Sequence, residues 1–155
     1  MYHLYRKQLL PISMDQGWNF FSDPYNLSTI TPPDMGFEVK SFSGKKELHR
    51  GQIITYNIRP LFGIAVKWVT EITHADQPDF FVDEQVLGPF SFWHHKHYLK
   101  PVEGGVEMID SLHYKMPFGF VGKLVHLLIV KKRLEKIFDF RAKKAEELFK
   151  GNKKP

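Results

Sequence analysis

Two histidines two positions apart, His95 and His97, are the residues best suited to chemistry. They lie in segment 92–100, which has the alternating pattern of a β-strand, and side chains two apart on a strand share a face. Trp93 therefore lies on the face of both histidines, whereas Lys96 lies on the opposite face, which we expect to be solvated. The pattern predicts two titratable imidazoles on a partly buried wall.

Segment 106–116 is the next predicted strand, and Asp110 is the single charge on its more apolar face, which also carries Tyr114. If this face and that of His95 and His97 both point inward, the three side chains lie near one another. The glycine-containing turn at 101–105 leaves the pairing register open, because a bulge there shifts every partner.

Three chemistries compete for His95, His97 and Asp110. A His-His-carboxylate set can bind zinc or iron, or act as catalytic acid and base. It can also form a polar wall that satisfies itself or orients a ligand. Two histidines at i and i+2 on a strand are a weak metal signal, so we predict no metal and no cofactor and favour the polar wall.

The long segment 119–150 contains no proline and predicts a helix. Steps of three and four place eight residues on one face, which must pack on a sheet: Leu124, Leu127, Lys131, Leu134, Phe138, Arg141, Ala145 and Leu148. Arg141 thus faces the interior, where a guanidinium requires a carboxylate or an anionic ligand. Its partner is either a protein carboxylate (Asp110, Asp83 or Glu71) or a ligand carboxylate or phenolate.

The remaining pattern predicts an α+β fold. Strands are expected at 2–10, 37–42, 52–59, 66–74, 80–87, 92–100 and 106–116, and two short helices, one capped by Ser13 and one at 25–30, follow the first strand. A seven-stranded antiparallel sheet twists and curves around the long helix. Trp68 shares a strand face with Thr70, but both faces of segment 80–87 are apolar, so the orientation of Asp83 stays open.

Length, composition and charge indicate the domain number, the location and the partners to expect. The 155 residues form one domain, 1–155, with 151–155 as a disordered tail, and the 14 phenylalanines favour a ring-lined cavity. The chain has no cysteine, no signal-peptide pattern and no membrane-length apolar run, so we expect a cytoplasmic protein. Its net charge of +5 comes with interleaved acids, which argues against nucleic acid and makes membrane contact an unfavoured alternative.

The order of elements and six local motifs resemble the SRPBCC, or START-like, helix-grip superfamily. The likeness is strongest to small bacterial ligand-binding SRPBCC proteins related to polyketide cyclases. The motifs are FFSDP at 20–24, ITPP at 30–33, FVDEQ at 81–85 followed by GPF at 88–90, WHHKH at 93–97, Gly105 with Asp110 and Tyr114, and IFDFR at 137–141. The resemblance implies an internal cavity for a lipid, isoprenoid or polyketide-like molecule.

We therefore predict binding of a hydrophobic or amphipathic small molecule. The expected ligand-binding residues are Trp68, Trp93, His95, His97, Asp110, Tyr114, Phe138 and Arg141. The alternative is an enzyme of the polyketide cyclase or dehydratase type, with catalysis by His95, His97 or Asp110 and Arg141 stabilising an enolate-like oxygen. The oligomeric state does not follow from the sequence.

Overall fold

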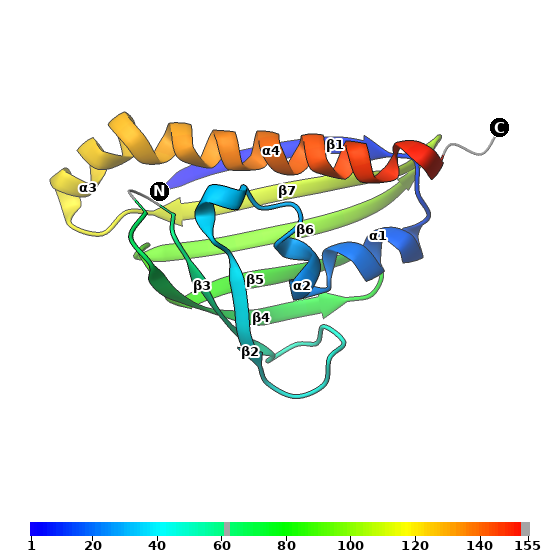
Figure 1. Ribbon diagram of the computed structural model, residues 1–155, viewed down its shortest axis with the longest axis horizontal. Coiled ribbons are helices and arrows are strands. Elements are labelled where there is room, and N and C mark those ends of the chain that lie inside the picture. The colour runs from blue at the N-terminus through cyan, green and yellow to red at the C-terminus, as the bar shows by residue number, and fades with distance from the viewer. Residues whose placement is uncertain (61–62, 153–155) are drawn as a thin grey trace.

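The computed structural model describes residues 1–60 and 63–152. A single curved sheet and one long C-terminal helix dominate it, and the helix lies across the concave face of the sheet (Figure 1). The predicted α+β helix-grip fold, with seven antiparallel strands, is confirmed. Of the tail predicted at 151–155, Gly151 and Asn152 belong to the 3-10 turn Lys150–Asn152 and so are ordered, and residues 153–155 lie outside the described part.

The chain begins with strand β1 (Tyr2–Leu10) and helix α1 (Met14–Phe21). Ser13 caps α1 in a capping box: the Gln16 backbone N–H donates to Ser13 Oγ, and the Gln16 side chain accepts from the Ser13 N–H. Helix α2 (Pro24–Leu27) is shorter than the predicted 25–30, and a 3-10 turn, Pro33–Met35, follows it. This segment crosses in front of the sheet below the long helix (Figure 1).

Six strands follow. They are β2 (Glu38–Phe42), β3 (Ile53–Ile58), β4 (Val66–Asp76), β5 (Phe80–Leu87), β6 (Phe92–Val102) and β7 (Gly105–Lys115). The spatial order is β1-β7-β6-β5-β4-β3-β2, so each strand from β2 to β7 pairs with its sequence neighbour, and β1 adds to β7. The turn between β6 and β7 is tighter than the predicted 101–105, because Gly104 adopts a φ of +86° that allows the chain to reverse directly.

The C-terminal helix contains a change of phase that the sequence does not reveal. It comprises α3 (Gly119–Val125), a π-helical turn (His126–Val130) and α4 (Lys131–Phe149). A π turn adds a residue and rotates the following face. The predicted apolar face is therefore wrong before the π turn: Leu124 and Leu127 are 49% and 66% exposed, and the buried face runs through Gly122, His126 and Val130. At the other end, Leu148 is 46% exposed although it lies after the turn.

The core lies between α4 and the sheet. Leu134, Phe138 and Ala145 are the buried residues of α4, and Phe138 packs in a cluster with Leu112 and Tyr114 of β7. Within residues 1–60 and 63–152, no helix is long and apolar enough to cross a membrane. The strands and α4 together form the rigid frame that holds the site described next.

Candidate functional site

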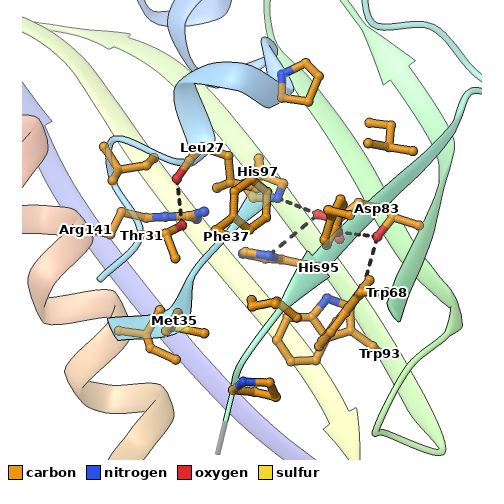
Figure 2. A pocket seen from close by; sticks show the side chains of 18 of the residues that line it. Leu27, Thr31, Met35, Phe37, Trp68, Asp83, Trp93, His95, His97 and Arg141 are labelled. Carbon is orange, nitrogen blue, oxygen red and sulfur yellow. Dashed lines mark hydrogen bonds and ion pairs between the residues drawn. The ribbon is translucent and has the colours of Figure 1, made fainter. Parts of the chain in front are cut away.

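A cavity of about 200 Å³ lies between α4, the concave face of the sheet and the segment that carries α2 and the 3-10 turn (Figure 2). Its walls are mainly apolar and aromatic. They include Phe21, Leu27, Ile30, Met35, Phe37, Ile54, Ile58, Trp68, Ile72, Phe81, Phe90, Trp93, Leu134, Ile137 and Phe138. Concave apolar sites with a few convergent polar groups are the usual form of small-molecule pockets.

One wall of the cavity carries a square of two histidines and two aspartates. In the sheet register Asp83 of β5 stands opposite His95 of β6, and Asp110 of β7 stands opposite His97. All four side chains project from the concave face, because residues two apart on a strand share a face. Adjacent strands thus bring together residues that are up to 27 positions apart, from Asp83 to Asp110.

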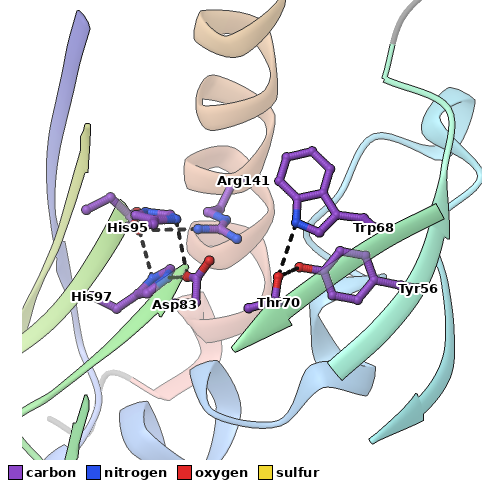
Figure 3. A network of polar contacts seen from close by, with 8 residues as sticks. Tyr56, Trp68, Thr70, Asp83, His95, His97 and Arg141 are labelled. Carbon is purple, nitrogen blue, oxygen red and sulfur yellow. Dashed lines mark hydrogen bonds and ion pairs between the residues drawn. The ribbon is translucent and has the colours of Figure 1, made fainter. Parts of the chain in front are cut away.

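Each histidine contacts both carboxylates. His97 Nε2 lies 2.7 Å from Asp83 Oδ2, and His97 Nδ1 lies 3.1 Å from Asp110 Oδ1. His95 Nε2 lies 2.9 Å from Asp110 Oδ1, whereas its Nδ1 is 3.6 Å from Asp83 Oδ2, beyond hydrogen-bond distance. Three short contacts therefore join the square, and the fourth, at His95 Nδ1, is an ion pair longer than a hydrogen bond (Figure 3).

The two histidines differ in charge because their partners differ. Burial opposes protonation of His97, but its hydrogen bonds to Asp110 and Asp83 outweigh burial and raise the pKa of His97. Burial and the positive charge of His97 lower the pKa of His95 despite its bond to Asp110. The protonated, doubly donating form is therefore favoured at His97, whereas the neutral form with an acceptor at Nδ1 is favoured at His95.

The aspartates are held ionised against the effect of burial. Burial favours the neutral form of Asp110, but the Arg141 charge and the bonds from His95 and His97 bring the pKa of Asp110 well below its usual value. Burial likewise opposes ionisation of Asp83, yet the bond from His97 and the nearby positive charges lower the pKa of Asp83. The positive charge of Arg141 and the hydrogen bonds from the histidines thus favour the ionised form of both carboxylates.

Arg141 reaches the square from α4. Its Nη1 donates to Asp110 Oδ1 over 3.2 Å, and its guanidinium lies 5.4 Å from the centre of the Phe138 ring. The side chain is 15% exposed and lines the cavity, into which Figure 2 shows it pointing. The Asp110 contact is its one hydrogen bond within the described residues, so the remaining N–H groups of Arg141 can serve a ligand oxygen.

A second, uncharged polar group lies on the wall formed by β3 and β4. The Trp68 indole Nε1–H donates to Thr70 Oγ1 over 3.1 Å, and the Thr70 and Tyr56 hydroxyls are hydrogen-bonded. All three residues line the cavity, and Figure 3 shows them across from Arg141 and the histidines. A ligand in the cavity would therefore meet a charged pole on one side and a hydroxyl pair on the other.

The predicted site residues divide into three groups. Trp68, Trp93, His95, His97, Phe138 and Arg141 line the cavity. Asp110 is not among the lining residues but contacts both histidines and Arg141. Tyr114 lies outside the lining: it is buried in the core cluster of β7 and α4, and its hydroxyl bonds to His126 Nε2 over 2.9 Å.

Sequence reasoning missed three cavity residues that could orient a ligand. Asp83 was left undecided, because both faces of its strand are apolar, yet it completes the histidine square. Tyr56 and Thr70 form the hydroxyl pair. The alternation of Ile54, Tyr56 and Ile58 within β3 was the available signal for Tyr56.

The square could also be considered as a metal centre. One ligand atom from each of Asp83, His95 and His97 lies within 4.8 Å of the others. However, both nitrogens of His97 face carboxylates and its pKa is raised, whereas a metal requires the deprotonated ring. The prediction that no metal binds here stays a prediction.

The fold is START-like: a curved antiparallel sheet and a long C-terminal helix are arranged as in several solved structures, one of which is described as a START superfamily protein. A START superfamily protein from Mycobacterium smegmatis aligns with a TM-score of 0.73 at 10% identity, covering 97% of this chain and 99% of that chain. TTHA0849 from Thermus thermophilus aligns with a TM-score of 0.70 at 16% identity, covering 99% of this chain and all of the other (100%). Ms6760 from Mycobacterium smegmatis aligns with a TM-score of 0.69 at 16% identity, covering 96% of this chain and 91% of that chain. No family model and no curated protein matches the sequence.

These matched proteins are 10% to 16% identical to this chain. At these identities the likeness concerns the fold, and activity depends on the site itself.

Proposed function

We propose that the protein binds one compact amphipathic molecule in the cavity, with an anionic or hydrogen-bonding end at Arg141. The observation that carries the proposal is the position of Arg141: its guanidinium lines an otherwise apolar cavity and has a single hydrogen bond within the described residues, to Asp110. A buried cation with unused donors recognises a carboxylate or phenolate oxygen. The apolar walls would take the rest of the ligand.

The size of the cavity limits the ligands that it can hold. A volume of about 200 Å³ lies below the roughly 300–1,000 Å³ typical of pockets for drug-sized ligands. A single- or double-ring phenol or a medium-chain acyl carboxylate suits this space better than a sterol or a large isoprenoid. The hydroxyl pair Tyr56 and Thr70 supplies a second polar contact for a ligand with oxygen at both ends. A cytoplasmic location is part of the proposal, on the sequence grounds given above.

Isothermal titration calorimetry with decanoate and 2-naphthol as probes tests this proposal. Ile137→Trp adds bulk inside the cavity, whereas Asp139→Trp adds the same bulk on the exposed side of α4. We expect one-to-one binding of at least one probe by the wild type and by Asp139→Trp, and at least about tenfold weaker binding by Ile137→Trp, since the ring occupies the ligand volume. Equal affinities in all three proteins would place the bound probe elsewhere and contradict the proposal.

His95 supports a second candidate, an enzyme of the cyclase or dehydratase type. Its Nε2–H is oriented by Asp110, its pKa is lowered and its Nδ1 has no hydrogen bond within the described residues. A neutral imidazole fixed by a carboxylate is the arrangement of a general base. In this reading His95 Nδ1 removes a proton from the substrate, and Arg141 donates to the oxygen on which charge develops.

Replacing His95 by glutamine separates binding from catalysis. The glutamine amide can still donate to Asp110 but cannot act as a base near neutral pH. If the protein is an enzyme, His95→Gln should hold the molecule that co-purifies with it unchanged, whereas the wild type should convert the same molecule to a product of different mass. Identical, unconverted ligand in both proteins after prolonged incubation would rule out His95 as a catalytic base for that ligand.

A further inference from the structure

The surface at the start of the C-terminal helix is apolar and exposed. Phe118 and Phe120 are 83% and 80% exposed, values that are high for phenylalanine. Together with four aliphatic neighbours they form what we call the apolar patch: Phe118, Phe120, Val121, Leu124, Leu127 and Leu128. Figure 1 shows α3, which carries much of this patch, at one extreme end of the molecule. Clustered exposed apolar residues mark interaction surfaces.

The helical segment that bears the patch is apolar on both faces. Gly122, His126 and Val130 recur every fourth residue and form its buried face against the rest of the domain. The opposite face carries Leu124 and Leu128, which are solvent-exposed. A helix that is apolar all round is normally covered on both sides, so the outer face lacks the partner that its composition requires.

The backbone holds Phe118 outward at a cost. Phe118 has φ 62° and ψ 29°, the left-handed region, and is the only non-glycine residue with positive φ in the described chain. A bulky residue in this region is strained, and such strain persists where the surrounding structure imposes it, often at functional positions. The turn is also tightly packed beside Phe118, because a Cβ on Gly122 would lie 1.9 Å from the Pro117 carbonyl oxygen.

The charged residues of the segment that bears the apolar patch are all positive. Residues 111–134 contain no aspartate or glutamate but five lysines and arginines: Lys115, Lys123, Lys131, Lys132 and Arg133. Beside the patch lies a surface pocket of about 470 Å³, to which Leu128 of the patch contributes. Its other described lining residues include four cations and one acid: Arg59, Lys132, Arg133, Lys136 and Asp34. Asp34 is paired with Arg133 over 2.8 Å, which leaves a net positive pocket.

We propose that the apolar patch docks on the surface of anionic lipid membranes, with the cationic pocket receiving a lipid phosphate or carboxylate group. Interfacial binding requires exposed aromatic and aliphatic residues next to lysines and arginines, and both occur here on one end of the domain. No described helix can span the bilayer, so the segment lies on the membrane. Met116 and Val130, which flank the patch in sequence, also line the cavity, so a docked protein could exchange its ligand with the lipid phase if the proposed function holds.

Vesicle co-sedimentation tests docking, with phosphatidylcholine vesicles that either contain or lack phosphatidylserine. We expect the wild type to bind the phosphatidylserine vesicles, and high salt to weaken that binding because it screens the attraction. Phe118→Ser/Phe120→Ser should reduce the vesicle–water partition coefficient at least about tenfold, since two rings that enter the lipid interface are lost. Lys123→Gln and Lys132→Gln should each reduce it about fivefold.

The matched control removes exposed apolar side chains from the other end of the molecule. Leu9→Ser/Leu148→Ser changes two exposed apolar residues, 55% and 46% exposed, and this variant should bind vesicles like the wild type. Equal binding by the patch and control variants, or no binding of the wild type to either vesicle, would overturn the proposal. A third result would also overturn the proposal: the wild type is a dimer that binds no vesicles, and Phe118→Ser/Phe120→Ser converts it to a monomer. In that case a second copy of the chain would cover the patch. Calorimetry of Phe118→Ser/Phe120→Ser with decanoate or 2-naphthol tests the cavity separately, so a failure of ligand binding can be told apart from a failure of membrane docking.

Discussion

His97 Nε2 and Asp83 Oδ2 are 2.7 Å apart across β5 and β6, and the same imidazole contacts Asp110 on β7 through Nδ1. One ring therefore links three adjacent strands directly behind the cavity. Because both of its nitrogens face carboxylates, His97 is a fixed donor. His95, with Nδ1 unbonded within the described residues, is the histidine that can respond to a ligand.

The opposite pKa shifts of the two histidines can be measured by NMR titration of the ring protons. We expect His97 to titrate above 6.5 and His95 below it. Asp83→Asn should lower the pKa of His97, because it removes one of the two carboxylates that stabilise the imidazolium. Asp79→Asn, an exposed change outside the square, should leave both pKa values unchanged. A His97 pKa at or below 6.5 in the wild type would contradict this assignment.

The pH dependence of stability follows from the same shifts. A raised pKa means that folded His97 holds its proton more tightly than the unfolded chain, so its contribution is present below pH 6.5 and is lost as pH rises through the folded pKa. The lowered pKa values of Asp83 and Asp110 act in the opposite sense, and their contribution is lost as pH falls below about 4.

Urea unfolding across this pH range checks the sign. The difference in unfolding free energy between the wild type and His97→Gln should be largest near about pH 5–6 and should shrink as the pH is raised above the folded pKa of His97. A difference that grows with rising pH would show that His97 is neutral in the folded protein.

The Arg141–Asp110 pair should be worth more to stability than a surface pair. Asp110→Asn leaves a largely buried guanidinium without its carboxylate, which costs about 3–5 kcal/mol of unfolding free energy. The double variant Arg141→Met/Asp110→Asn should lose less unfolding free energy than the two single variants added together, since each single change leaves the other residue's charge buried without its partner. Glu147→Gln, which breaks the exposed contact to Lys144, is the control and should leave stability near the wild-type value. Strict additivity of the two buried changes would refute a direct pairing.

Arg141 should discriminate between ligands of equal length that differ in charge. Arg141→Gln is expected to weaken decanoate binding by about ten- to a hundredfold, the value of a charged hydrogen bond, and to leave decanol binding close to wild type. Calorimetry with both probes gives the comparison. An equal loss for decanoate and decanol would mean that Arg141 shapes the cavity and does not contact the ligand's polar end.

Alternation along strands made much of the site predictable. The pattern of Trp93, His95 and His97 against Lys96 assigns the inner face of β6, and the structure brings Asp110 to that face through the β6–β7 register. Asp83 was not predictable, because both faces of β5 are apolar and only the packing of the neighbouring strands decides between them.

The helix shows the limit of periodicity. A strict three-four repeat predicted Leu124 and Leu127 as buried, but the π turn at His126–Val130 changes the phase, and no composition signal marks where a single extra residue is inserted. The exposed apolar patch was hidden by the same error, since Leu124 and Leu127 were counted as core.

Native mass spectrometry of the gently purified protein most directly tests whether the cavity holds a ligand. We expect a one-to-one small-molecule adduct on the wild type and on Asp139→Trp. The adduct should be lost on denaturation and absent from Ile137→Trp, whose added ring occupies the ligand volume. The same adduct on a folded Ile137→Trp protein, or the bare polypeptide mass for the wild type with no decanoate or 2-naphthol adduct after addition, would contradict this expectation.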